Sequence, residues 1–119
     1  MTAIAINTIT AQRMAHVLPL VQAQVPAADE AYVWMGAVAT GLNRLFDPKF
    51  KFVASDFGTA PTADDVVDVT LADGDDARAT SLAAELGVSV GLILSAALCT
   101  GMGKLSGDRS RLIGTFEEI

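Results

Sequence analysis

The sequence predicts a mostly α-helical single domain that also holds one short two-stranded antiparallel ribbon. Three observations lead to this fold class. The chain has 119 residues, the size of one ordinary domain. Its residues are 51% hydrophobic and 18% charged, which supplies ample apolar surface for a core and excludes intrinsic disorder. The chain also repeats itself, because two successive segments each show the pattern strand, helix, turn, helix.

We expect one domain over residues 1–119, with the first repeat in residues 1–46 and the second in residues 64–105. Residues 47–63 include Pro48, Gly58 and Pro61 and show no clear hydrophobic period, so they are expected to form a linker. The tail, residues 106–119, is polar with scattered apolar side chains. We expect it to pack back on the body of the domain.

The repeat is clearest between residues 31–45 and 91–105, which lie sixty positions apart. They share the pattern Ala-x-x-Thr-Gly-x-x-(Arg/Lys)-Leu. Residues 86–103 carry no charge and reach the length of a membrane span. The first copy has only thirteen uncharged residues between Glu30 and Arg44, which is too short to cross a bilayer. If both copies play one role, both are core helices of a protein in water, and no membrane is expected as a partner.

Before each of these helices lie a further apolar-periodic segment and a strand-like segment. Residues 11–25 and 75–86 show apolar positions at helical spacing, although Pro19 suggests that the first helix starts only near that residue. Residues 4–9 and 66–71 are short and rich in branched side chains, as strands are. Residues 73–76 should supply a turn and a helix cap. Asp29 and Ser89 suit the caps of the later helices, and Gly87 suits a left-handed helix end.

Residues 67–105, with the turn Gly87-Val88-Ser89 before an apolar helix, resemble a ribbon-helix-helix domain. The first half is similar, with Pro26 where glycine is usual. Two copies in one chain resemble the tandem, pseudo-dimeric form found in bacterial DNA-transfer and plasmid functions. The resemblance implies paired strands over a four-helix core, with the later helices crossing at its centre. We expect that crossing to use the small faces formed by Ala31, Met35, Ala39, Asn43, Gly91, Ser95, Cys99 and Gly103.

The resemblance also implies a function, because this family reads duplex DNA with the outward side chains of its ribbon. If Ile4 and Ile6 face inward, the outward residues that would meet base edges are Ala5, Asn7, Asp68 and Thr70. Ser89, at the start of the last helix, would hold a phosphate. The implied protein is a non-catalytic, DNA-associated regulatory or accessory protein with double-stranded DNA as its partner.

The charge pattern favours a different partner. The chain has a net charge of −6, and residues 61–107 hold two basic against seven acidic residues, a balance of −5. Neither predicted strand carries a lysine or arginine, although phosphate contacts require positive charge. The alternative is therefore an acidic protein-interaction module or inhibitor that keeps the scaffold without binding DNA. Both alternatives remain open from the sequence, as does association of the pseudo-dimer into an oligomer.

The sequence does not predict an enzyme. His16 is the only histidine and Cys99 the only cysteine, so triads and histidine or cysteine metal sites lack partners. We expect His16 to be a structural residue, and Cys99, Trp34 and Tyr32 to belong to the core. No catalytic residue, metal site or cofactor is expected. The first residues have neither the basic region nor the apolar run of a signal peptide, which predicts a cytoplasmic location.

Overall fold

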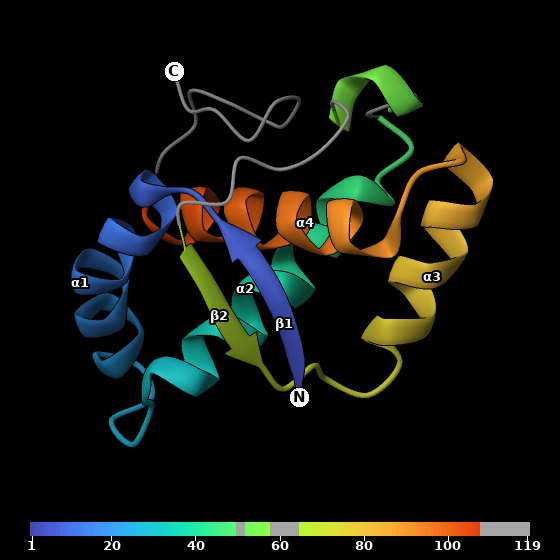
Figure 1. The fold of residues 1–119 in the computed structure, drawn as a ribbon. Coiled ribbons are helices and arrows are strands. Elements are labelled where there is room, and N and C mark those ends of the chain that lie inside the picture. Colours follow the sequence, from blue (N-terminus) through green and yellow to red (C-terminus); the bar gives the residue numbers. More distant parts are fainter. Residues whose placement is uncertain (50–51, 58–64, 108–119) are drawn as a thin grey trace.

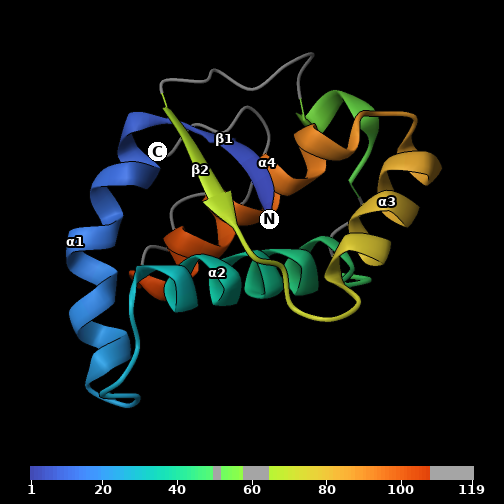
Figure 2. The same ribbon diagram turned by 60° about the horizontal axis from the view of Figure 1, so that its bottom comes forward.

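The computed structural model describes residues 1–49, 52–57 and 65–107 of the chain. It is mostly helical with one short two-stranded antiparallel sheet, as the sequence predicts. Figures 1 and 2 show the sheet lying over the crossing of two central helices, α2 and α4, with the helices α1 and α3 at opposite ends. The elements, in chain order, are β1 (Thr2–Ile6), α1 (Thr8–Gln22), α2 (Glu30–Leu45), the 3-10 helix η1 (Ala54–Phe57), β2 (Asp65–Val69), α3 (Asp75–Leu86) and α4 (Val90–Leu105).

The ribbon pairs β1 with β2 so that Ile4, the middle residue of β1, lies opposite Val67, the middle residue of β2. Ile4, Ile6 and Val69 are at most 1% exposed, so the predicted alternation of inward and outward side chains is confirmed. β1 ends at Ile6, earlier than the expected Ile9. It stops there because Asn7 caps α1, with its Oδ1 accepting a hydrogen bond from Thr10 N at 2.8 Å.

The expectation that α1 starts only near Pro19 is wrong, since α1 runs unbroken through that residue. Pro19 cannot donate to the carbonyl of Ala15, which a continuous helix would otherwise use. Both residues lie on the exposed side of α1. The apolar side of α1, led by Met14 and Val17, faces the core. That packing outweighs the loss of one backbone hydrogen bond.

The central helices α2 and α4 approach so closely that each presents a glycine to the other's backbone. A Cβ built on Gly41 would lie 1.8 Å from the carbonyl oxygen of Ala97, and one built on Gly101 would lie 1.8 Å from that of Ala37. These four residues are the alanine and glycine of the repeated pattern. The expected crossing is confirmed, but the expected faces are wrong. Ala31 and Asn43 are exposed, and the contact uses a stripe two positions away.

The predicted caps of the central helices are confirmed. Asp29 accepts a hydrogen bond from Tyr32 N at 2.9 Å, and Ser89 accepts one from Leu92 N at 3.2 Å. Gly87 has the expected positive φ of 74° at the end of α3. The start of α3 falls within the expected residues 73–76, where Gly74 occupies the cap position with φ 86° and no side-chain hydrogen bond.

The predicted linker contributes to the core. Phe57, at the end of η1, is fully buried and packs in the central hydrophobic cluster. Phe52 is half-buried beside it, with the two ring centroids 6.1 Å apart. The tail expected to pack on the body lies outside the described residues from position 108 onward.

The apolar character of α4 is explained by burial, since every residue from Leu92 to Gly103 is buried. Within the described part of the chain, no single helix has the length and hydrophobicity to cross a membrane. Helices α3 and α4 reach that length and composition only as a pair, and they are bent by 115° relative to each other.

Candidate binding surfaces

Helices α2 and α4 lie on one side of the ribbon, and no described helix covers the opposite side (Figure 1). We call it the ribbon face, and it consists of two cross-strand pairs, Ala3 with Asp68 and Ala5 with Val66. Val66 is 56% exposed, Ala3 and Asp68 are exposed, and Ala5 is half-buried. The ribbon face therefore carries small apolar side chains and one carboxylate, that of Asp68, at its edge.

The five residues proposed to contact DNA do not form one surface of free side chains. Ala5 and Asp68 lie on the ribbon face, and Thr70 is exposed just beyond the end of β2. Asn7 is half-buried, and its amide oxygen is occupied in capping α1. Ser89 is exposed, but its hydroxyl caps α4. The capping role of Asn7 was missed, although asparagine at the point where a strand pattern ends is a known cap signal.

Positive charge lies elsewhere in the part of the chain that the structure describes. Neither β1 nor β2 holds a lysine or arginine. The described lysines and arginines lie on helices or in the segment after α2, and they are Arg13, Arg44, Lys49, Arg78 and Lys104. The Arg78 side chain contacts Asp75 on its own helix and two residues at the end of α2. Its guanidinium lies 3.1 Å from Asp75 Oδ1 and 2.8 Å from Asn43 Oδ1, and 5.1 Å from the centroid of the Phe46 ring. The cations described here thus do not compensate the carboxylate on the ribbon face.

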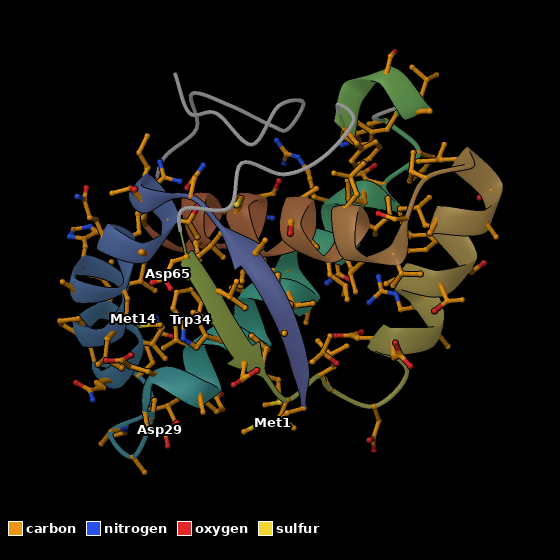
Figure 3. All side chains as sticks on the ribbon, in the orientation of Figure 1. Met1, Met14, Asp29, Trp34 and Asp65 are labelled. Carbon is orange, nitrogen blue, oxygen red and sulfur yellow. The ribbon has the colours of Figure 1, made fainter. Side chains whose placement is uncertain are left out.

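A cavity of about 450 Å³ opens beside the end of the ribbon, between α1, the first turn of α2 and the start of β2. We call it the ribbon-end pocket. Figure 3 shows Met14, Trp34 and Asp65 gathered in this region. The buried side chains of Ile6, Met14 and Trp34 contribute its apolar floor, whereas Glu30 and Asp65 are exposed. The remaining lining residues are Ala11, Ala15, Leu18, Pro19 and Val67.

A second hollow of about 330 Å³ lies between the end of α1 and the side of α2. Its lining includes Leu20, Val25 and Tyr32, which are 47%, 37% and 44% exposed. The expectation that Tyr32 belongs to the core is therefore wrong, since it lies in the first turn of α2 on the solvent side. Trp34, two positions later, is 8% exposed and does belong to the core.

The described residues show no group of three or more histidine, cysteine, aspartate or glutamate side chains that could hold a metal ion. Cys99 is 3% exposed within α4, as expected for a small core residue. His16 is exposed on α1 and lies outside the core.

Comparison of the chain with models of known families, with curated proteins and with solved structures found no match in any of the three.

Proposed function

We propose that the chain is a tandem ribbon-helix-helix domain in which two strand–helix–helix halves complete each other. The reciprocal contacts of Gly41 with Ala97 and of Gly101 with Ala37 support this arrangement, because a two-fold relation between the halves requires such matching pairs. The ribbon adds support, since its register is centred on Ile4 and Val67. Neither half could bury its own apolar faces or pair the backbone hydrogen-bonding groups of its single strand. Pairing of the halves therefore has a physical cause.

We further propose that this domain is a non-catalytic protein-interaction module whose ribbon face contacts a protein partner. The observation that carries the proposal is the chemistry of that face: Ala3, Ala5 and Val66 offer apolar contact, Asp68 offers a negative charge, and no cation lies on either strand. An exposed valine flanked by alanines can be covered by another protein with little desolvation cost. Phosphate oxygens brought to the same face would meet a carboxylate instead of a cation.

A DNA-associated role is the second candidate, and the architecture favours it. A two-stranded ribbon with one exposed face is a shape that can enter the major groove, and Thr70 and Asp68 are exposed at its edge. Threonine can contact either groove edge, and aspartate can accept from cytosine. The lack of positive charge on the ribbon opposes this role, so the protein-binding role is preferred.

Duplex binding at low salt separates the two candidates. We expect the wild-type protein to leave the fluorescence anisotropy of a labelled duplex unchanged even at about 20 mM salt, where phosphate contacts are strongest. Ala5→Lys/Asp68→Lys should gain binding that disappears as salt rises. The matched control, Ser81→Lys/Glu85→Lys, places two lysines at exposed positions of α3 with the same change in net charge and should gain less.

Two results of this experiment would contradict the proposal. Binding of DNA by the wild-type chain, weakened by Thr70→Ala, would replace the protein-binding role with the DNA-associated role. Equal gains in the two lysine variants would show that the ribbon has no special access to the groove, which would count against the ribbon-helix-helix proposal. For a protein partner recovered with the wild-type chain, Val66→Arg should abolish capture while the circular dichroism spectrum stays the same.

A further inference from the structure

The ribbon-end pocket combines an apolar floor with two carboxylates, and the described residues that line it include no positively charged side chain. Met14 and Trp34 are 6% and 8% exposed, so the floor is fixed by core packing. Glu30 and Asp65 come from different elements, the first turn of α2 and the start of β2. The pocket therefore exists only in the folded domain, where separate parts of the chain bring these groups together.

The second half of the chain provides an internal comparison. At the sixty-residue offset that relates α2 to α4, Val90 corresponds to Glu30 and Leu94 corresponds to Trp34. At the start of the other strand, Thr2 occupies the position that Asp65 has in β2. The same architecture thus forms in the second half with aliphatic and hydroxyl side chains. The second half thus forms without two carboxylates and an indole at the matching place.

We propose that the ribbon-end pocket binds an arginine side chain presented by a protein partner. A guanidinium group has five donors in a planar fork and pairs well with carboxylates such as Glu30 and Asp65. The alkyl part of the arginine would pack against the apolar floor, and an indole is the best aromatic neighbour for a cation. This inference rests on the proposed function only in naming a protein as the source of the arginine.

The expected affinity of one side chain is low. Each exposed ion pair contributes a few-fold in binding, so the two carboxylates together should favour a cationic over a neutral ligand by about tenfold. Higher salt should reduce this preference, because both carboxylates are exposed and screened. The apolar floor should bind the neutral ligand weakly at any salt concentration.

Titration with small probes tests the pocket without a known partner. Trp34 is the only tryptophan in the chain, so its fluorescence and its indole N–H resonance report on this site alone. The probe is N-acetyl-arginine methylamide, and the matched neutral probe is N-acetyl-citrulline methylamide, which has the same shape without the charge. We expect saturable shifts of the Trp34 resonance in the millimolar range with the arginine probe, and about tenfold weaker binding of the citrulline probe.

The double variant Glu30→Gln/Asp65→Asn should bind the two probes equally and weakly, with its fold checked by circular dichroism and thermal unfolding. Equal binding of both probes to the wild-type protein, or no saturable shift, would overturn the inference, as would unchanged preference in the double variant. Failure here is distinct from failure of the proposed function. The probe titration does not involve the ribbon face, and Ala3→Arg, at the end of that face remote from Asp65, should leave it unaltered.

Discussion

Replacing Gly41 or Gly101 by alanine tests the central crossing directly. Ordinary van der Waals contacts of a Cβ begin at about 3.4 Å, whereas the added Cβ would lie 1.8 Å from a carbonyl oxygen, a deficit of about 1.6 Å. The clash is with backbone, so no side-chain rotation relieves it and α2 and α4 must move apart. Overpacking of this kind costs about 1–3 kcal/mol or more, and the higher helix propensity of alanine returns about 1 kcal/mol. We expect each variant to lose about 2 kcal/mol of unfolding free energy.

The assay is urea unfolding followed by far-ultraviolet circular dichroism, with the slope of the transition compared between variants. Gly36→Ala is the matched control, because Gly36 lies on the same helix as Gly41 and a Cβ there meets nothing within 4 Å. It should stabilise the protein by a few tenths of a kcal/mol to about 1 kcal/mol.

The double variant Gly41→Ala/Gly101→Ala adds a test of reciprocity. One separation of the helices relieves both clashes, so the double variant should lose less stability than the sum of the single losses, with a coupling of about 0.5–3 kcal/mol. Equal behaviour of Gly41→Ala and Gly36→Ala would refute the close crossing, and simple addition of the two losses would refute its reciprocity.

Three further predictions concern residues whose roles emerged from the structure. Asn7→Ala should lose about 1 kcal/mol of unfolding free energy because α1 loses its cap, while Asn7→Asp should retain most of it; thermal unfolding measures both, and equal losses would contradict the capping role. Phe57→Ala should lower the free energy of unfolding, measured in urea, by about 3–5 kcal/mol because Phe57 belongs to the core. A loss below about 1 kcal/mol would contradict its burial. Cys99 should react with a thiol reagent far more slowly than in urea-unfolded protein, and equal rates would contradict its burial in α4.

Much of the fold follows from local signals in the sequence. Asp29 and Ser89 cap helices through hydrogen bonds to residues three positions away, so a short stretch of sequence is enough to identify them. Alternation of branched side chains predicts the ribbon and its inward face, because a strand has a period of two. The repeated pattern predicts that α2 and α4 play matching roles.

The remaining features depend on contacts between distant segments. Both central helices carry more than one line of small residues at four-residue spacing, and only the packed structure shows that Gly41 and Gly101 lie at the crossing. Phe57 lies in a segment without hydrophobic period, so its burial against α4 has no local signature. The ribbon-end pocket joins Glu30 and Asp65 across thirty-five positions of sequence, and no pattern within either element indicates their proximity.

The antiparallel pairing of β1 with β2 within one polypeptide makes closure of the sheet a unimolecular event. The melting temperature of the domain should therefore not depend on protein concentration. In an assembly whose strands come from separate subunits, the melting temperature would rise with concentration. Because both strands belong to one polypeptide, their sequences need not be identical. A mutation of Val66 changes β2 and leaves β1 unchanged, so the two strands of the sheet can change their chemistry independently.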